Sequence, residues 1–529
     1  MGSNINISGS SNLKYEIVKE IMIDIKTEPE DPMMNASKCN NIYRVPCNLR
    51  KLNKDAYTPQ LVSIGPLHYG RKKLRPMQTH KLHYLNLFIE ERLKGKIEAM
   101  DKFKDFLKEK ERKIRQCYAK KLFCGKKLVD LVLLDSVFIM ELFLRIQRRR
   151  KEEGDDNNVD VPKQTCLSCC CTEIGCDGNH GAVSKQTSSD DDDVILKQTW
   201  LNKSIQRDLL LLENQIPLFI LEELYSSVVP ETDKQRDKFI EVAYDYFECF
   251  HPYEKIKDEK QDSDHPNPSG NNNNLDSDSQ KKPSFRFERL KKNWRNDPAH
   301  FTDLIRYFYL SKEVASPEKV SSSCVLRTAT KLRESGISFE KVTDRSLVDI
   351  KLEKVKILSW FLCLGCLPKS SYFKARLQIP QLKVDDTTEC VLRNLIAFEQ
   401  CHYSDQPYIC NYVSLIDSLI HTKDDVELLV EKEVIVHELG SDTEVATLVN
   451  SLCKHVVADK TCYRKIIDEM NKQYQNEWYR TMASLRLVYF KDAWRASSTL
   501  VGIAVLVFTI FNFCRVVKLV LELDQRRPN

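Results

Sequence analysis

The sequence carries little net charge and lacks the short motifs that mark common enzyme families. Its 81 Lys and Arg residues against 76 Asp and Glu residues leave a formal net charge of +5 at pH 7, so no field of one sign favours a nucleic-acid partner. No G-x-G-x-x-G, P-loop, H-E-x-x-H or G-x-S-x-G motif is present. We therefore expect no catalytic residues, no cofactor and no nucleic-acid partner, with an enzyme of unknown reaction as the alternative.

Features of secreted proteins are also missing. The first thirty residues contain no apolar core of signal-peptide type, since the run Ile21–Ile25 is short and interrupted by Asp24. The 19 cysteines are scattered through 529 residues instead of forming the dense framework of a small disulfide-bonded module. This pattern favours reduced thiols. The sequons at Asn6, Asn35 and Asn202 would matter only if the folded part lay outside the cytosol.

A long apolar run near the C-terminus is the most informative feature that is present. Residues Ala496 to Cys514, ASSTLVGIAVLVFTIFNFC, contain no charge, and a helix of this length can cross the hydrocarbon core of a bilayer. Its ten Leu, Ile, Val and Phe side chains contribute roughly 3 to 6 kcal/mol of insertion free energy, against smaller costs from Ser, Thr and Asn. We predict a single transmembrane helix followed by a short tail over 515–529, with a buried soluble helix as the alternative.

The position of this run suggests how the protein meets the membrane. An anchor so near the C-terminus leaves the ribosome at the end of synthesis, so we expect a C-terminal anchor in the plasma membrane with the bulk of the chain in the cytosol. Basic residues lie on both flanks, including Arg495 and Arg515, so the flanks do not fix the orientation. Ser498 and Gly502 have small-x-x-x-small spacing, which makes them a candidate contact for homo-oligomers through the transmembrane helix.

Helical patterns dominate the rest of the chain. Residues 1–40 are polar and are predicted to be flexible, and a helical domain is expected over 41–495. Leu128–Leu144 is apolar nearly all round, which is typical of a central core helix. A second apolar helix is predicted from Leu209 to Leu224, broken or kinked after Asn214 by Pro217.

Two segments are expected to be disordered insertions in this domain, because almost none of their residues could be buried. They cover 148–198 and 254–283 and contain runs such as SSDDDD and GNNNN.

Strand patterns are confined to a smaller part of the chain. Alternating or β-branched residues occur in Ser338–Val342, Leu347–Leu352 and Leu377–Val384. The predicted fold class is therefore mainly α with a small antiparallel β element (α+β). From Tyr463 to Arg495 there is neither glycine nor proline, and apolar residues recur at three and four positions. This pattern predicts about 50 Å of helix that runs almost unbroken into the span.

The best metal candidate combines C-x2-C with C-x3-H. Cys166, Cys169, Cys176 and His180 supply sulfur and imidazole ligands at spacings that can close around zinc. These residues lie inside a predicted disordered insertion, so solvent-facing reduced cysteines are the favoured interpretation. Zinc binding and acylation of the Cys169–Cys171 cluster are the alternatives. The sequence therefore supports only a weak metal candidate.

Two further groups have a functional and a structural interpretation. Cys401-His402 suggests a nucleophile and a base, but sequence neighbours rarely share the geometry that activation requires, so packing is favoured. Asp385, Asp386 and Glu389 could bind a hard cation. Their position after a predicted strand fits the cap and first turn of a helix better.

Four stretches together resemble one plant family. They are IYRVPCNLRKLNKDAYTPQLVSIGPLHYG (Ile42–Gly70), RDLLLLENQIP (Arg207–Pro217), NLIAFEQCHY (Asn394–Tyr403) and ELGSDTEVATLVNSLCK (Glu438–Lys454). The chain resembles the "domain of unknown function 247" proteins over most of 42–514. The resemblance implies a plant single-pass membrane protein without established enzymatic activity, and some members are linked to self-incompatibility.

One stretch departs from that family. Trp360–Phe373 lengthens a connection that in relatives passes directly from a strand into I-P-x-L, and an unspliced intron or gene-model error is one hypothesis for it.

Together, the apolar span, the helical domain and the missing catalytic motifs predict a membrane-anchored protein that acts in recognition or signalling and binds an unidentified protein partner. A structural membrane scaffold is a further alternative.

Overall fold

The computed structural model describes most of the chain, namely residues 41–94, 97–120, 122, 125–155, 193–228, 238–252, 287, 291–292, 294, 296–319, 326–343, 345–356, 373–457, 459–477, 480–481 and 493–524. The chain divides into two compact units. Unit 1 comprises Met1–Lys312, Asp385–Ile409 and Lys454–Val457, and unit 2 comprises Glu313–Val384, Cys410–Cys453 and Ala458–Asn529. The sequence analysis predicts one domain over 41–495. The difference arises because the two units alternate along the chain, so no linker of distinct composition separates them.

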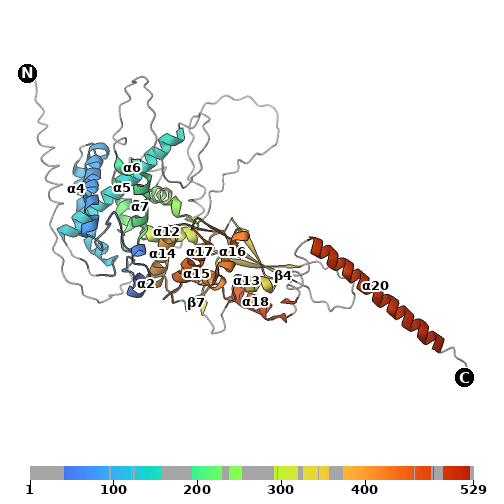
Figure 1. Ribbon diagram of the computed structural model, residues 1–529. Helices are drawn as coiled ribbons and strands as arrows, with labels where there is room; N and C mark the ends of the chain where they lie inside the picture. The colour runs from blue at the N-terminus through green and yellow to red at the C-terminus, as the bar shows by residue number, and fades with distance from the viewer. Residues whose placement is uncertain are drawn as a thin grey trace, which may run out of the picture. The chain divides into compact units, whose positions relative to one another are not determined.

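Unit 1 is built from helices (Figure 1). Its α-helices are α2 (Cys47–Leu52), α3 (Pro76–Leu87), α4 (Ile97–Gln116), α5 (Lys126–Asp155), α6 (Val194–Lys197), α7 (Thr199–Leu210), α8 (Leu218–Val228), α10 (Phe239–Tyr246), α12 (Phe301–Tyr309) and α14 (Thr388–His402). Shorter helical turns are the 3-10 turns η1 (Asp55–Tyr57), η2 (Lys72–Leu74) and η5 (Glu248–Phe250) and the π-helical turn η3 (Phe88–Arg92).

Helix α5 is the central helix of unit 1. It packs against α3, α4, α8 and α10, and every residue from 128 to 143 is buried. This confirms the core helix predicted over Leu128–Leu144. A helix that is apolar nearly all round needs neighbours on all sides, and these four helices supply them.

Buried partners balance the acidic residues of α5. Asp135 forms an ion pair with Lys81 and also accepts a hydrogen bond from the backbone N–H of Gly65 at 2.7 Å. Glu141 pairs with Arg145 one turn further on, at 2.8 Å. Since an unpaired buried charge is costly, these partners allow α5 to carry acids in an apolar core.

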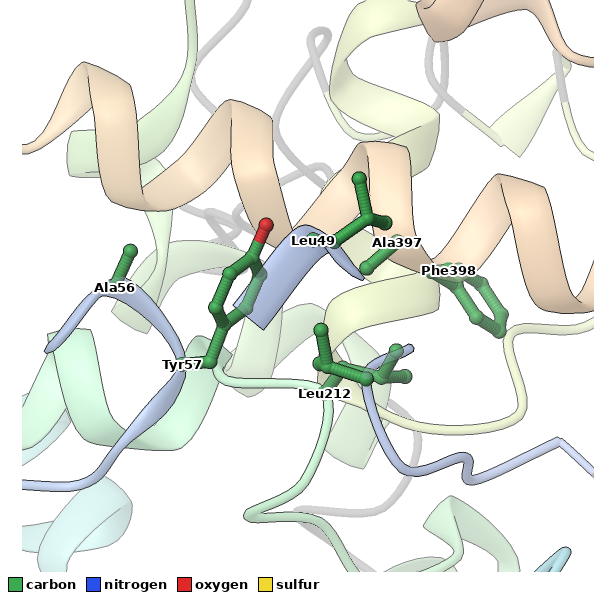
Figure 2. Packing of buried hydrophobic residues seen from close by; sticks show 7 residues of the cluster. Leu49, Ala56, Tyr57, Leu212, Ala397 and Phe398 are labelled. Carbon is green, nitrogen blue, oxygen red and sulfur yellow. The ribbon is translucent and has the colours of Figure 1, made fainter. Parts of the chain in front are cut away.

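A hydrophobic cluster joins the start of the described chain to a much later helix. The cluster combines side chains from the α2 region, from η1, from the segment after α7 and from α14. Its members are Val45, Leu49, Ala56, Tyr57, Leu212, Ala397 and Phe398. Figure 2 shows Leu49 beside Ala397, with Tyr57 and Phe398 on either side. Burial of these side chains therefore holds three distant stretches of sequence together.

Unit 2 combines helices with short strands. The helices are α13 (Ala329–Glu334), α15 (Tyr408–Leu419, which begins in unit 1), α16 (Lys423–Glu431), α17 (Asp442–Leu452), α18 (Arg464–Gln475) and α20 (Ala493–Asp524). The strands are β1 (Glu318–Lys319), β2 (Ser338–Val342), β3 (Lys351–Lys356), β4 (Phe373–Pro380), β5 (Leu382–Val384), β6 (Ile435–His437) and β7 (Lys460–Thr461). Helix α17 starts at a cap that the capping-box spacing of Ser441-Asp442-Thr443-Glu444 predicts, and the Ser441 side chain accepts from the N–H of Glu444.

The strands form small sheets. The three-stranded sheet has the order β2-β4-β3, and the other pairs are β1-β7 and β5-β6. β3 pairs with β4 antiparallel from Lys351↔Gln378 to Lys356↔Phe373, whereas β2 pairs with β4 in parallel. The mainly helical fold with a minor β element is confirmed. Because β2 is parallel to β4, the sheet is mixed and not purely antiparallel as predicted.

The strand predictions differ in accuracy. β2 has the bounds predicted for it, and the predicted Leu377–Val384 falls on β4 and β5. The third strand begins at Lys351, later than the predicted Leu347. Leu347 and Val348 are fully buried in a turn, so their apolar character reflects core packing and not strand pairing.

The helix predicted to run almost unbroken from Tyr463 into the span is interrupted at Asn476, and residues 482–492 lie outside the described residues. Helix α18 ends at Gln475, and Asn476 has extended backbone angles of φ −80° and ψ 109°. Asparagine is a poor helix former, and the absence of glycine and proline alone does not keep a helix intact.

The predicted insertions and the flexible lead-in fall mostly outside the described residues. The insertion expected over 148–198 is too long at both ends, because α5 continues to Asp155 and α6 begins at Val194. An aspartate fixes the second boundary: the Asp193 side chain accepts from the N–H groups of Ile195 and Leu196. Residues 1–40 and 254–283 lie outside the described residues, so these two predictions stand as such.

Candidate functional site

The segment between α7 and α8 is held in place by its own polar side chains. The amide nitrogen of Gln215 donates to the carbonyl of Leu211 at 2.9 Å, and its oxygen accepts from the N–H of Phe301 at 3.0 Å. The oxygen of Asn214 accepts from the N–H of Ile64 at 2.7 Å. These bonds replace helical ones, so α7 ends at Leu210 and not at the predicted break after Asn214.

Asp208, on the last turn of α7, organises an extended strip of backbone. Its carboxylate accepts hydrogen bonds from the successive N–H groups of Gln60, Leu61 and Val62 at 2.9, 2.7 and 2.9 Å. The side chain is fully buried. Charged acceptors form stronger hydrogen bonds than neutral ones, so Asp208 fixes the course of a segment that has no regular structure.

Glu213 organises the start of the described chain in the same way. It accepts from the N–H of Val45 at 2.7 Å, pairs with Arg50, and lies 3.2 Å from the ring of His68. Burial alone would raise the pKa of the Glu213 carboxyl, but the His68 ring, the Arg50 charge and the Val45 N–H outweigh burial and lower the pKa. Glu213 is therefore a buried carboxylate whose partners all belong to the protein, which gives it a structural role.

A small polar pocket in unit 1 is the best candidate for a binding site. Three tyrosines, Tyr307, Tyr403 and Tyr408, line it together with polar residues that include Arg306, His402 and Asp405. We call it the Tyr403 pocket; its volume is about 190 Å³. Its walls come from α12, the end of α14 and the turn that leads into α15.

A buried guanidinium forms part of this pocket. Arg306 donates from Nε to Glu399 at 2.8 Å and from Nη2 to the carbonyl of Gln406 at 3.1 Å. Its guanidinium carbon lies 3.9 Å from the centroid of the Tyr403 ring, in a cation–π contact. The Tyr403 hydroxyl donates to Asp303 at 3.1 Å. The pocket wall is therefore fixed by a connected polar network.

Cys401 and His402, which precede Tyr403 in the sequence, are held by burial and packing. Burial raises the pKa of the neighbouring Cys401 thiol to about 11, so the thiol is protonated at neutral pH. The ring of His402 stacks on Phe398 at 5.4 Å, and its Nδ1 lies 2.9 Å from the Tyr43 hydroxyl. This arrangement agrees with the packing interpretation of Cys401-His402.

The acidic group before α14 orders the turn that leads into the helix. The Asp385 carboxylate accepts from the N–H groups of Thr387 and Thr388 at 2.9 and 3.0 Å. Glu389 in the first turn pairs with Arg393 at 2.7 Å. These bonds agree with the interpretation favoured from the sequence.

The predicted zinc candidate cannot be placed. Cys166, Cys169, Cys176 and His180 all lie outside the described residues. Within the part of the chain that the structure describes, no group of three or more His, Cys, Asp or Glu side chains is arranged to hold a metal ion.

Helix α20 contains the predicted span. Residues Ser497–Leu519 form a stretch of 23 residues with a mean hydropathy of 2.3, long and apolar enough to cross a membrane. It starts one residue after the predicted Ala496 and ends five residues beyond the predicted Cys514. None of its most apolar window is buried against protein, and both Ser498 and Gly502 are exposed on it. The alternative of a buried soluble helix is therefore not seen.

Comparison with known proteins identifies the family. The model of DUF247, described as plant protein of unknown function, matches residues 42–508. The chain belongs to this family. Two DUF247 relatives come from Arabidopsis thaliana: UPF0481 protein At3g47200 is 27% identical over 89% of this chain and 85% of its own length, and UPF0481 protein At3g02645 is 24% identical over 88% of each. No solved structure matches the chain.

The structure shows what the stretches that suggested DUF247 do. Ile42–Gly70 supplies the backbone that Asp208 and Glu213 bind, Arg207–Pro217 supplies those side chains, and Asn394–Tyr403 forms one wall of the Tyr403 pocket. The pocket residues from α12 were missed in the sequence analysis. An arginine between aromatic residues in the run FTDLIRYFY was the available signal, but a single sequence does not show that this run faces Tyr403.

Proposed function

We propose that this DUF247 protein is a membrane-anchored, non-enzymatic recognition or signalling protein, held by α20 and binding another protein through its folded units. The observation that carries the proposal is the exposed apolar stretch Ser497–Leu519. Large apolar side chains such as Val505 and Phe508 are about 60% and 67% exposed there. Exposure of so many apolar side chains to water costs free energy, and burial of these side chains in lipid would remove that cost.

The proposal includes a location and an orientation. We place α20 in the plasma membrane, with the bulk of the chain in the cytosol and the tail after the span on the other side. Self-association through Ser498 and Gly502 stays a prediction.

The non-enzymatic part of the proposal is supported by the chemistry of the Tyr403 pocket. The Arg306 and Tyr403 side chains of the pocket are engaged by Glu399 and Asp303, and burial raises the pKa of the Cys401 thiol, which precedes His402 in the sequence, to about 11. A nucleophile or base poised near neutral pH would favour the alternative of an enzyme.

The membrane part is tested by placing charges in the middle of α20. Val505→Arg together with Phe508→Arg should release the full-length protein from membranes, since each arginine at the bilayer centre costs about 2.5 to 3.5 kcal/mol. The matched control, Val505→Ile with Phe508→Leu, should stay in the membrane pellet after alkaline carbonate extraction. An arginine variant that remains in the pellet would refute anchoring by α20.

Orientation is tested on the same protein with an N-glycosylation sequon added after Asn529. If the bulk of the chain is cytosolic, the added sequon is glycosylated and Asn202 is not, which endoglycosidase treatment shows as a mass shift. The opposite pattern would reverse the orientation.

A further inference from the structure

Positive charge is concentrated in one part of unit 1. Residues 101–130 contain eleven Lys and Arg side chains against five Asp and Glu side chains, a formal charge of +6, whereas the whole chain carries +5. This part covers most of α4, the start of α5 and the connection between them. Asp105 and Asp130, which pair with Lys108 and Lys104, are included in the count. The excess therefore remains after these ion pairs have formed.

The fold brings cations of both helices together. α4 packs against α5, and the N–H of Gly125 donates to the Glu111 carboxylate of α4 at 2.8 Å. Lys108 from α4 and Lys126 from α5 line the same hollow, whose volume is about 400 Å³. Arg112 and Arg115 continue the row of Lys108 along α4, because residues three and four apart lie side by side on a helix. We call these exposed cations the α4–α5 surface: Lys108, Arg112, Arg115 and Lys126.

Neighbouring acids hold this surface only loosely. Lys108 pairs with Asp105 at 2.8 Å and Arg115 with Glu111 at 3.8 Å, and the two cationic side chains are 59% and 41% exposed. Exposed ion pairs contribute little to stability and are screened by salt, so another anion can replace the acid. α8 also packs against α4 and adds two glutamates and no cation, which leaves a formal charge of +4.

An anionic membrane surface matches this charge. Insertion of the exposed span Ser497–Leu519 would keep the folded units close to one bilayer, so that a second contact with the same bilayer is an intramolecular event. The cytosolic leaflet contains anionic lipids, and each Lys or Arg near such a surface strengthens binding about fivefold. An acidic protein has the same sign of charge but does not share this proximity.

We propose that the α4–α5 surface docks on anionic lipid headgroups in the cytosolic leaflet of the membrane that α20 spans. Lys108, Arg112, Arg115 and Lys126 bind the phosphates and carboxylates of the headgroups, and this contact holds unit 1 at the membrane. The inference rests on the anchor and the orientation proposed above and adds a second membrane contact to them.

The first experiment uses full-length protein in nanodiscs of phosphatidylcholine, so that α20 is already inserted and only other surfaces can bind a second membrane. Vesicles that contain phosphatidylserine should co-sediment the discs, whereas vesicles of phosphatidylcholine alone should not. Binding should be lost when salt is raised from about 0.1 M to about 1 M, because the Debye length falls from about 10 Å to about 3 Å. Equal co-sedimentation with both kinds of vesicle would overturn the proposal.

A triple variant then tests whether the α4–α5 surface is responsible. Lys108→Gln, Arg112→Gln and Arg115→Gln together remove three positive charges, and glutamine is a good helix former. The affinity for phosphatidylserine vesicles should fall about a hundredfold, from about fivefold for each charge. Circular dichroism checks that the variant is folded, and an unchanged affinity would refute the site.

The matched control removes the same number of charges from unit 2. Lys331, Arg333 and Lys423 are exposed on α13 and α16, and their replacement by glutamine changes the net charge of the chain equally. This variant should keep most of the affinity for phosphatidylserine vesicles. A loss as large as that of the α4 variant would show that overall charge binds the lipid, and would overturn the assignment to the α4–α5 surface.

An oligo-glutamate peptide distinguishes an acidic protein partner from lipid. Binding of this peptide by discs that do not bind phosphatidylserine vesicles would assign the surface to a protein and refute lipid docking. The result is separate from the test of the anchor. Carbonate-resistant anchoring without phosphatidylserine-dependent binding refutes only this inference, whereas release of the wild-type protein by carbonate refutes the anchor.

Discussion

Replacement of Asp208 tests whether the carboxylate on the last turn of α7 holds the strip of backbone over residues 60–62. Asp208→Ala removes an acceptor that binds the N–H groups of Gln60, Leu61 and Val62. The site is fully buried, so water cannot simply replace the lost oxygen atoms. We expect Asp208→Ala to lower the free energy of unfolding of unit 1, and residues 60–62 to open before the rest of the unit.

The magnitude follows from the number of bonds. Each buried donor left without a partner costs about 1 to 3 kcal/mol, which gives about 3 to 9 kcal/mol for three N–H groups. Burial raises the pKa of the Asp208 carboxyl, so removal of the charge recovers part of that cost. We therefore expect a net loss of about 3 to 5 kcal/mol for Asp208→Ala.

Asp208→Asn is the informative comparison. The oxygen Oδ2 accepts from all three N–H groups, at 3.0 Å from Gln60, 2.7 Å from Leu61 and 2.9 Å from Val62. An asparagine with its oxygen at that position keeps these bonds but loses the charge. The expected loss is smaller, about 1 to 2 kcal/mol, because hydrogen bonds to charged groups are the stronger ones.

Urea unfolding and hydrogen exchange measure these effects. The urea midpoint should fall in the order wild type, Asp208→Asn, Asp208→Ala, and the amides of residues 60–62 should lose protection more than those of α5. Asp101→Asn, an exposed change on α4, should stay within about 0.5 kcal/mol of wild type. An Asp208→Ala protein that unfolds like Asp101→Asn would refute the reasoning.

Two other predictions concern pH and the β3–β4 connection. Burial lowers the pKa of His300 from 6.5 to about 4. As the pH falls, the His300 ring therefore takes up a proton in the unfolded chain before it does so in the folded protein. The contribution of the neutral ring to the free energy of unfolding is complete above about pH 6.5 and declines by about 3 kcal/mol toward pH 4. His300→Asn keeps a capping acceptor for α12 without a titrating ring, so its urea midpoint should fall less over this pH range; an identical decline would contradict the assignment. Replacement of residues 357–372 by Asn-Gly should leave the fold intact and stabilise it by up to about 2 kcal/mol, because Lys356 and Phe373 are register partners that a two-residue turn can join. A scrambled 357–372 segment is the control for composition, and a lowered thermal midpoint in the Asn-Gly variant would show that unit 2 needs these residues.

The sequence predicts those elements whose signal is local. The core helix α5 follows from an apolar run of sufficient length, β2 from alternation, and α17 from the Ser441 cap. The sequence patterns misplace the end of α7 and miss the break after α18. In the first case side chains bind backbone from distant segments, and in the second an asparagine adopts extended angles that many sequences allow.

The candidate site also combines features that the local sequence indicates with contacts between distant residues that it does not indicate. In the sequence, Asn394–Tyr403 is one of the stretches that resemble the family, and Cys401-His402 suggests a nucleophile and a base. The sequence does not show that Arg306, 97 positions before Tyr403, stacks on the Tyr403 ring, nor that Asp303 accepts a hydrogen bond from the Tyr403 hydroxyl. Such contacts between distant residues depend on how α12 packs against α14, which local patterns do not encode.

The sequence by itself determined that this protein is mainly helical and that it ends in an apolar helix long enough to span a bilayer, because helix periodicity and apolar length are properties of neighbouring residues. Only the tertiary structure decided three further features: the chain divides between two units, Asp208 and Glu213 bind partners from the segment before α3, and a tyrosine-lined pocket forms beside Arg306. These features join residues that are far apart in the sequence, so their energies depend on packing and burial that arise only on folding.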